Sequence, residues 1–476
     1  MKSSSLFSLV LAFLAIVYVS NALKVDCTDD ANLDCSDGFD TGGLSRKAFP
    51  QGFQFGTATS AYQVEGMASK DGRGPSIWDP YVQVPGHIKG NATGEVSVDQ
   101  YHHYKGTGEV NQLGIDYYNR LIDYMLERGI TPYANLYHYD MPLALQEKYN
   151  GLLRCDVVKD YADYADFCFK TFGDRVKNWF TFNEPRIIAA LGFDNGLNPP
   201  SRCSKEVGNC TAGDSGTEPY IAAHNMILAH AAAVERYREK YQKEQGGRIG
   251  ILLDFVWYEP LTRSKADNYA AQRARDFHIG WFLHPITYGE YPRTMQELVK
   301  DRLPKFTEAE VQMVKGSIDY VGINVYTGYY MMDPPWPQSN ITSYQNDWNV
   351  GFSFERHGKP VGPLYVQVFD ICKRALWKPN HDSLGKWYGP TRQYTFPEVL
   401  HDNIRINYYR DYISSMKKAI DDGANVIGYF AWSLLDNFEW LSGYTSRFGI
   451  VYVDYDTLKR YPKMSAYWFQ QWLKKD

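Results

Sequence analysis

Short apolar runs alternate with amphipathic stretches along most of this chain. The apolar runs with strand character are 53–58, 131–136, 179–183, 249–255, 320–326 and 426–433. The helical stretches between them include 114–127, 159–172, 218–243 and 405–421. Strands that alternate with helices and are apolar on both faces indicate a parallel sheet. The length of 476 residues and the lack of a dinucleotide-binding glycine motif favour the α/β class and a single-domain (β/α)8 TIM barrel over a doubly wound sheet.

Two stretches interrupt this alternation, because six strands are found where a barrel needs eight. A short helical stretch, 99–105, leads almost directly into the helix that begins at 114, which leaves no room for a strand between them. The second stretch, 363–400, is rich in Lys, Arg, Pro, His and Trp and has no strand pattern. The sequence therefore predicts an incomplete barrel over 23–476, without strands 2 and 7 and with an aberrant segment at about 364–400. Unpaired strand edges predict an unstable or aggregation-prone chain.

Composition narrows the possible classes of protein. With 44% hydrophobic and 22% charged residues the chain is too apolar to be disordered. Its net charge of −5 is spread without a basic block, which argues against nucleic acid as a partner. Aromatic residues reach 16%. This aromatic content fits either a Tyr-rich core and surface or stacking platforms for sugar rings.

The first 22 residues have the three parts of a secretory signal peptide. Lys2 precedes an apolar run from 6 to 19, and small residues end at Ala22. We expect a mature chain that is secreted to the cell exterior or cell wall, or is vacuolar, and that has no membrane contact after cleavage. Acceptor sequons for N-glycosylation begin at Asn91, Asn209 and Asn340.

The seven cysteines are an odd number for an oxidising compartment. Cys203 and Cys210 flank a short polar loop and form a candidate disulfide, and Cys27 and Cys35 form a second one. Those left over are Cys155, Cys168 and Cys372. We expect Cys168 to be a buried thiol. No spacing is typical of a zinc site, and we expect no metal and no cofactor.

Polar and aromatic residues recur where the predicted strands end, which is where barrels carry their chemistry. They are Gln63, Glu65, His138, Asp140, Asn183, Glu184, Tyr326, Trp432, Glu439 and Trp440. Any one of them alone is usually a structural or solvated residue. Their repeated position favours a shared functional site.

The segments that carry these residues resemble family-one glycoside hydrolases, the β-glucosidases, and most closely the plant members. Residues 181–185 read Thr-Phe-Asn-Glu-Pro, like the acid/base motif of that family. Residues 60–66 and 430–440 resemble its two sugar-binding motifs, and 137–140 and 322–326 extend the match. The resemblance covers nearly the whole mature chain.

The resemblance implies a retaining enzyme that hydrolyses terminal β-D-glucosides, in small glucosides or oligosaccharides, by double displacement between two carboxyl groups. Glu184 corresponds to the catalytic acid/base, and Asn183 to the residue that binds the sugar 2-hydroxyl. The other implied substrate-binding residues are Gln63, His138, Tyr326, Trp432, Glu439, Trp440 and Phe448. Tyr326 would contact the nucleophile, and Trp432 would stack on the sugar ring.

The nucleophile motif of the family, Thr/Ser-Glu-Asn-Gly, occurs nowhere in the chain. Residues 371–393 can be translated back into nucleotides with a free choice among the codons for each amino acid. Read one nucleotide later, this sequence can encode Leu-Ser-Glu-Asn-Gly, and the Glu codon then spans the codons of Gly385 and Lys386. This fit predicts a shifted reading frame and an inactive chain as written. The alternative is a catalytically inactive sugar-binding protein or a mis-spliced product. A glucosyl-transferring enzyme would use the same two carboxyl groups and also stays open.

Overall fold

The computed structural model describes residues 38–66, 73–98, 111–336, 338–361 and 396–474, together with strand β1 (Ala12–Ala15). These residues divide into two compact units. The central unit comprises residues 74–81 and 135–361, and the terminal unit comprises 38–66, 73, 82–98, 111–134 and 396–474. Apart from β1, the predicted leader 1–22 lies outside the described residues, as do 99–110 and 362–395.

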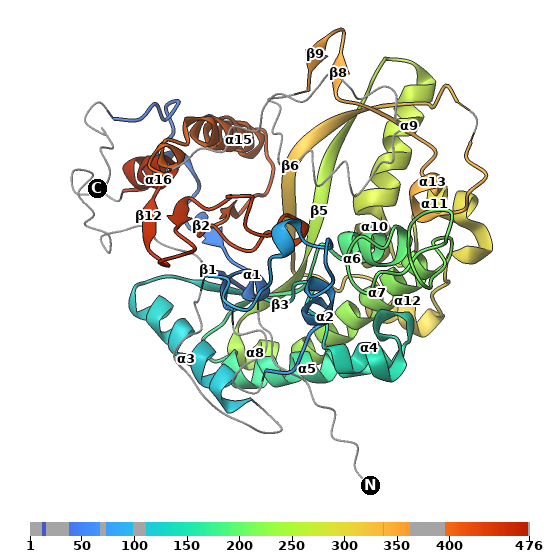
Figure 1. Ribbon diagram of the computed structural model, residues 1–476, viewed down its shortest axis with the longest axis horizontal. Coiled ribbons are helices and arrows are strands. Elements are labelled where there is room, and N and C mark those ends of the chain that lie inside the picture. Colours follow the sequence, from blue (N-terminus) through green and yellow to red (C-terminus); the bar gives the residue numbers. More distant parts are fainter. Residues whose placement is uncertain are drawn as a thin grey trace. The chain divides into compact units, whose positions relative to one another are not determined.

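The strands run in the order β1-β3-β4-β5-β6-β7, and most of this sheet belongs to the central unit. Its strands are β3 (Pro132–Tyr137), which crosses the boundary between the units, β4 (Asn178–Asn183), β5 (Arg248–Pro260), β6 (Tyr320–Met332) and β7 (Gly351–Ser353). β4, β5 and β6 are parallel, whereas β7 joins the end of β6 in the antiparallel sense. Figure 1 shows β5 and β6 side by side as two long curved strands. β8 (Glu355–Arg356) and β9 (Lys359–Pro360) form a small hairpin.

Helices follow the strands of the central unit and bury their apolar faces. The longest are α5 (Asp156–Phe172), α7 (Glu218–Tyr237) and α9 (Lys265–Arg275). On α5 the buried positions recur every three or four residues, as an amphipathic helix requires, and they include Cys168 and Phe169. Phe169 lies 5.1 Å from Trp179 of β4 and 4.7 Å from Tyr237 of α7, measured between ring centroids. One aromatic cluster therefore fixes α5 and α7 to the strand that leads to Glu184.

The remaining helices of the central unit are short. They are α2 (Trp78–Val82, the last residue of which belongs to the terminal unit), α4 (Leu143–Tyr149), η3 (Gly151–Leu153), α6 (Pro185–Ala189), η4 (Ala190–Asp194), η5 (Arg238–Gln242), α8 (Lys243–Gln245), η6 (Asp276–Gly280), α10 (Trp281–Tyr288), α11 (Arg293–Val299), η7 (Lys300–Arg302), α12 (Glu308–Val314) and α13 (Tyr344–Asp347).

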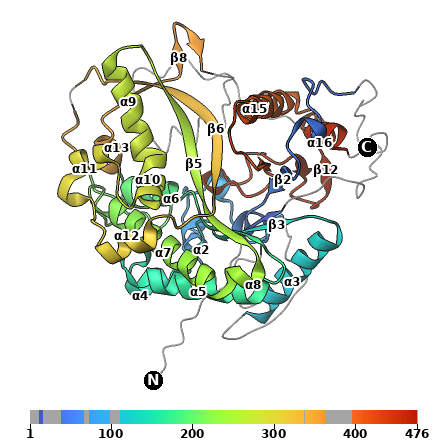
Figure 2. The same ribbon diagram turned by 180° about the vertical axis from the view of Figure 1, so that it is seen from behind.

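In the terminal unit the first and the last of the predicted strands are neighbours. β2 (Gln54–Ala58) pairs in parallel with β10 (Gly428–Trp432). The other elements of this unit are η1 (Arg46–Ala48), α1 (Ala61–Val64), η2 (Lys89–Asn91), α3 (Gln112–Glu127), η8 (Glu398–Leu400), α15 (Asn403–Asp421), η9 (Trp440–Ser442), the antiparallel pair β11 (Val451–Val453) and β12 (Arg460–Pro462), and α16 (Met464–Leu473). Phe55 packs edge-on against Trp472 at 5.0 Å, so aromatic rings join β2 to α16. Figure 2 shows α15 and α16 from the opposite side.

All six predicted strands are present, with two differences in length. β5 and β6 run five or six residues beyond the predicted ends, because residues 257–260 pair with 328–331. In these extensions the apolar residues do not alternate with polar ones, so the hydrophobic pattern does not reveal them as strands. In the first half of β6, Val321, Ile323 and Val325 are each 37–39% exposed. Among the described residues no helix is long and apolar enough to cross a membrane.

Candidate active site

Glu184 stands at the end of β4, at the turn into α6. All six residues of β4 are buried, and Pro185 begins the helix at a position where its missing N–H costs nothing. The backbone of Glu184 is left-handed, with φ 47° and ψ 57°. Its N–H donates to the carbonyl of Leu252 on β5 at 2.8 Å. A left-handed backbone at a residue other than glycine costs about 1–3 kcal/mol and is typical of functional sites.

Neutral donors hold both oxygens of the Glu184 carboxyl group. The Asn324 amide, on β6, donates to Oε1 at 2.7 Å and also to Asn183 Oδ1 at 3.1 Å. The Tyr139 hydroxyl donates to Oε2 and accepts from Asn183 Nδ2 at 3.2 Å. Side chains that follow β3, end β4 and lie on β6 thus form a ring of hydrogen bonds around one carboxyl group.

A second carboxylate, Asp254 on β5, lies in the same unit and is tied to cationic and imidazole donors. Arg186 Nε donates to Asp254 Oδ2 at 2.7 Å, and a second guanidinium nitrogen contacts the same oxygen. His278 Nε2 donates to Oδ2 at 2.7 Å, while His278 Nδ1 accepts from the Tyr258 hydroxyl at 2.5 Å. Arg186 and His278 hold the pKa of Asp254 well below its usual range, although burial opposes this.

These surroundings place the pKa of Glu184 near neutrality. Burial, and after it the charge of Asp254, raise the pKa of Glu184 from 4.5 to about 7. The hydrogen bonds from Tyr139 and Asn324 and the charge of Arg186 act in the opposite direction. A carboxyl group that titrates near the working pH can both give and take a proton, which is what a general acid/base requires.

His138 and Tyr326 also belong to the central unit. Burial lowers the pKa of His138 to about 4, so its imidazole is neutral at pH 7 and has one donor and one acceptor nitrogen. The backbone N–H of His138 donates to Asp140 Oδ1 at 3.1 Å, which fixes the turn after β3. Tyr326 lies on β6 and is 40% exposed.

The terminal unit holds a separate polar cluster built on Gln63, which is fully buried in α1. Gln63 Nε2 donates to Asn437 Oδ1 at 3.0 Å, to Glu439 Oε2 at 3.2 Å and to the Phe438 carbonyl at 3.0 Å. Gln63 Oε1 is buried and has no hydrogen-bond partner among the described residues. Because a buried acceptor without a partner is costly, this oxygen is well suited to a hydroxyl donor on a ligand.

Aromatic side chains accompany this cluster. Trp440 stacks on Tyr62, with 5.9 Å between the ring centroids and 11° between the planes. Trp432 ends β10 and Phe448 lies on the loop before β11, both half-buried. Glu65 accepts from the Tyr118 hydroxyl at 2.8 Å.

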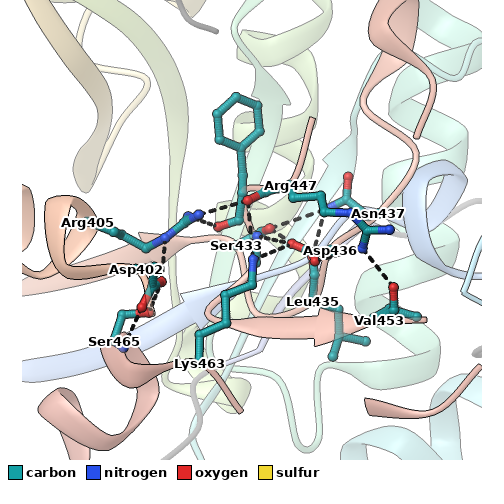
Figure 3. A network of polar contacts seen from close by, with 12 residues as sticks. Asp402, Arg405, Ser433, Leu435, Asp436, Asn437, Arg447, Val453, Lys463 and Ser465 are labelled. Carbon is teal, nitrogen blue, oxygen red and sulfur yellow. Dashed lines mark hydrogen bonds and ion pairs between the residues drawn. The ribbon is translucent and has the colours of Figure 1, made fainter. Parts of the chain in front are cut away.

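A buried network of ions supports the loop that carries these residues (Figure 3). Asp436 is fully buried, and its oxygens accept from Lys463 Nζ at 2.8 Å and from an Arg447 guanidinium nitrogen at 3.1 Å. The Gly449 N–H donates to the same carboxylate at 3.0 Å. Next in the chain, Asn437 Nδ2 donates to Ser433 Oγ at 3.1 Å. This network therefore fixes the segment between Trp432 and Glu439.

The predicted site residues are divided between the two units. His138, Asn183, Glu184 and Tyr326 belong to the central unit, and Gln63, Trp432, Glu439, Trp440 and Phe448 belong to the terminal unit. Tyr139, Asn324 and Asn437 lie within the motifs that resemble the family, but the motifs give them no role. The sequence patterns do not single out Asp254, Arg186 or His278. Asp254 had a signal, since it is an acidic residue within an otherwise apolar run.

The predicted disulfide between Cys203 and Cys210 is present, with 5.4 Å between the Cα atoms. Cys168 is a buried free thiol, as predicted, and Cys155 is free and exposed. The pair Cys27 and Cys35, and also Cys372, lie outside the described residues. The three sequon asparagines are exposed, and their glycosylation stays a prediction. No group of residues able to hold a metal ion occurs within the described ranges.

Known proteins match this chain along most of its length. The profile described as "Glycosyl hydrolase family 1" matches residues 45–107, 104–362 and 389–476. Beta-glucosidase 44 of Arabidopsis thaliana is 62% identical, over 92% of this chain and 93% of its own length. Beta-glucosidase 26 of Oryza sativa subsp. japonica is 59% identical, over 91% of this chain and 92% of its own length.

Solved structures agree with the sequence matches. A rice β-glucosidase, a mutant of which was solved in a covalent complex with Glc, has a TM-score of 0.82 and 42% identity, over 91% of this chain and 100% of its own. A fungal β-glucosidase from Humicola insolens, solved in complex with glucose, has a TM-score of 0.77 and 35% identity. The match covers 91% of this chain and 99% of the fungal one. These structures confirm the (β/α)8 barrel fold that the sequence predicts.

Proposed function

Because this chain belongs to glycosyl hydrolase family 1, we propose that it is a retaining β-glucosidase with Glu184 as its acid/base. The observation that carries the proposal is the Glu184 carboxyl group, which is held at both oxygens and has a pKa raised to about 7. The relatives that match over nine tenths of the chain are β-glucosidases by name, which supports the same activity and terminal β-D-glucosides as substrates.

The reaction requires two carboxyl groups with different roles. Glu184 donates its proton to the glycosidic oxygen while a second carboxylate attacks the anomeric carbon, so that the aglycone leaves as an alcohol and a glucosyl ester forms. Glu184 then takes a proton from water, whose oxygen attacks the anomeric carbon, releases the second carboxylate and restores the original configuration. In retaining enzymes the two carboxyl groups stand about 5–5.5 Å apart.

We assign substrate binding to groups whose geometry suits hydroxyls and sugar rings. Asn183 and neutral His138 offer donors and acceptors in the central unit. In the terminal unit, Gln63 Oε1 is an acceptor for which the described part of the chain offers no donor, and Glu439 is a nearby carboxylate. Trp432 and Trp440 offer aromatic faces for the apolar side of a sugar ring.

We also infer that the chain as written lacks the nucleophile. The sequence contains no Thr/Ser-Glu-Asn-Gly motif. The family profile does not match 363–388, where the shifted reading frame is inferred. It also matches 104–107 twice, at the place where the second strand is expected to be missing. These interruptions support an altered gene product rather than a different family.

The missing motif favours a second candidate function, a sugar-binding protein without catalysis. Such a protein would keep the hydroxyl-binding groups and Glu184 but would form no glucosyl ester. Loss of one member of a catalytic unit typically lowers the rate by several powers of ten.

One assay separates these proposals. The secreted chain is incubated with phenyl β-D-glucoside, whose poor leaving group needs a proton, with and without sodium azide, and with Glu184→Gln as the control. Hydrolysis without azide and with retained configuration would support the enzyme and contradict the missing nucleophile. Turnover only with azide, giving α-glucosyl azide, would support Glu184 as the acid and the loss of the nucleophile. Glucose binding by calorimetry without turnover in either condition would support the sugar-binding protein.

Sequencing the transcript between the codons of His102 and His401 tests the reading frame itself. A message that restores a second strand and reads Ser-Glu-Asn-Gly would show that the protein made is a complete retaining enzyme. A message identical to this sequence would leave the nucleophile absent.

We propose secretion or vacuolar delivery from the leader at 1–22. The sequon residues Asn91, Asn209 and Asn340 are exposed, which supports the secretory route. A fall in apparent mass after peptide N-glycosidase treatment of the plant-expressed protein is the expected result. An unchanged mass in protein recovered from the cytosol would contradict it.

A further inference from the structure

Asp254 is the acidic side chain whose charge acts on Glu184, and the backbone places it there. β4 and β5 are parallel with Asn183 opposite Leu252, and the Glu184 N–H donates to the Leu252 carbonyl. Asp254 lies two residues further along β5, so its side chain projects from the same face as Leu252. Asp254 is the register partner of Asn324 on β6, and the Asn324 amide donates to Glu184 Oε1 at 2.7 Å, so one side chain links the position of Asp254 to the Glu184 carboxyl group.

Asp254 is built to stay ionised. Its side chain is 12% exposed, and those of Arg186 and His278 are 5% and 1% exposed. Three donor atoms converge on Oδ2, two from Arg186 and one from His278. His278 is itself held by the Tyr258 hydroxyl, and Arg275 donates to the Tyr258 carbonyl at 2.6 Å. Burial and the charge of Arg186 lower the pKa of His278 to about 4, so it donates as a neutral imidazole.

This arrangement also withholds a cation from Glu184. Arg186 follows Glu184 by two residues and would favour the ionised carboxylate if its charge were free. Asp254 neutralises that charge at hydrogen-bond distance. The groups that act on Glu184 are therefore Asp254, Arg186, Tyr139 and Asn324. Tyr326 acts on Tyr139 in turn, since its charge raises the pKa of the Tyr139 hydroxyl.

We propose that Asp254 is a positioning residue that keeps Glu184 in its proton-donating form near neutral pH. In a retaining enzyme the neighbouring nucleophile supplies such a negative charge. Here the charge comes from β5, one strand away from Glu184, and it does not depend on the nucleophile motif. This inference rests on the proposed acid/base role of Glu184, but it concerns the proton equilibrium of that residue rather than turnover.

The test measures the titration of Glu184 directly. Protein labelled with ¹³C at the Glu carboxyl carbon is titrated by NMR, and the Glu184 signal is identified as the one absent in Glu184→Gln. In Asp254→Asn the midpoint of Glu184 is expected to fall by about one to three pH units, because a negative charge is lost and Arg186 becomes free to act. Asp254→Glu, which keeps the charge, is expected to restore a midpoint close to that of the parent.

Asp347→Asn is the matched control. Asp347 is a buried aspartate of the same unit that accepts from Arg302 and from the Tyr220 hydroxyl at 2.6 Å. Its loss also leaves a guanidinium, that of the partly exposed Arg302, without its carboxylate partner, but no shift is expected at Glu184. If Asp254→Asn does not fold, Arg186→Gln/Asp254→Asn removes both charges and is titrated in its place, with a fall in midpoint again expected because the negative charge outweighs the cation in the parent.

An unchanged midpoint in folded Asp254→Asn, or an equal fall in Asp347→Asn, would overturn the proposal. Because the readout is a carboxyl titration, an inactive protein with the expected shift would contradict the proposed function alone. An active protein without the shift would contradict only the role of Asp254.

Discussion

The carboxyl group of Glu184 and that of Asp436 are both buried, yet their surroundings differ in kind. Asp436 accepts from two cations, Lys463 and Arg447, and from a backbone N–H. Glu184 accepts from the neutral donors Tyr139 and Asn324. Cationic partners fix a carboxylate in one charge state, whereas neutral donors leave it free to change. The comparison separates a group that supports the fold from one suited to proton transfer.

The largest expected effect comes from breaking the ion network in the terminal unit. Asp436→Ala leaves Lys463, whose side chain is 1% exposed, as a buried charge without its carboxylate partner, and it should lower the free energy of unfolding by about 3–5 kcal/mol. Urea unfolding followed by circular dichroism measures this. Asp422→Ala is the control, because Asp422 pairs with Lys418 at the surface of α15. Equal losses in both variants would show that burial of the network adds nothing.

Glu184→Gln should stabilise the protein, and only at higher pH. The folded pKa of Glu184 is about 7 and its ordinary value is 4.5, so the folded state binds more protons between these values. Stability is therefore lost as pH rises from 4.5 to 7, and glutamine does not incur that loss. We expect a gain of about 3 kcal/mol above pH 7 and none below 4.5, measured by urea unfolding at both pH values. A gain that is independent of pH would contradict this account.

Buried histidines should make the central unit sensitive to acid. Burial lowers the pKa of His230, which shares a hydrogen bond with Thr181 Oγ1 at 2.7 Å, from 6.5 to about 3. The unfolded state therefore binds one more proton between these values, and stability falls as pH decreases from 6.5 towards 3. In His230→Gln the slope of the unfolding free energy against pH should decrease by the amount that about one bound proton contributes. A slope that His230→Gln leaves unchanged would contradict this account.

The smallest expected effect is at the Tyr139 hydroxyl. Tyr139→Phe removes a donor to the Glu184 carboxylate, so the midpoint of Glu184 in the NMR titration should rise by less than about one pH unit. Tyr161→Phe removes another buried hydroxyl of this unit, which donates to the Thr181 carbonyl, and serves as the control. A fall in the midpoint of Tyr139→Phe would contradict the hydrogen-bond direction in the structure.

The sequence predicted the strands and the polar residues at their ends, because burial and chemistry leave local patterns. It could not reveal the ion network, since Asp436 and Lys463 are 27 residues apart and nothing in either segment specifies the other. Tyr139 and Asn324 lie in segments that resemble the family. Their hydrogen bonds to Glu184 could not be predicted, because the partner of a side chain depends on the three-dimensional structure. Asp254 was missed because it lies within a strand rather than after it.

The left-handed backbone of Glu184 also sets stability against activity at this position. A buried carboxyl group on a strained residue lowers stability, whereas Gly adopts the same conformation without strain. Gly would also remove the proton donor, so the side chain that the reaction requires is not the one that the fold favours.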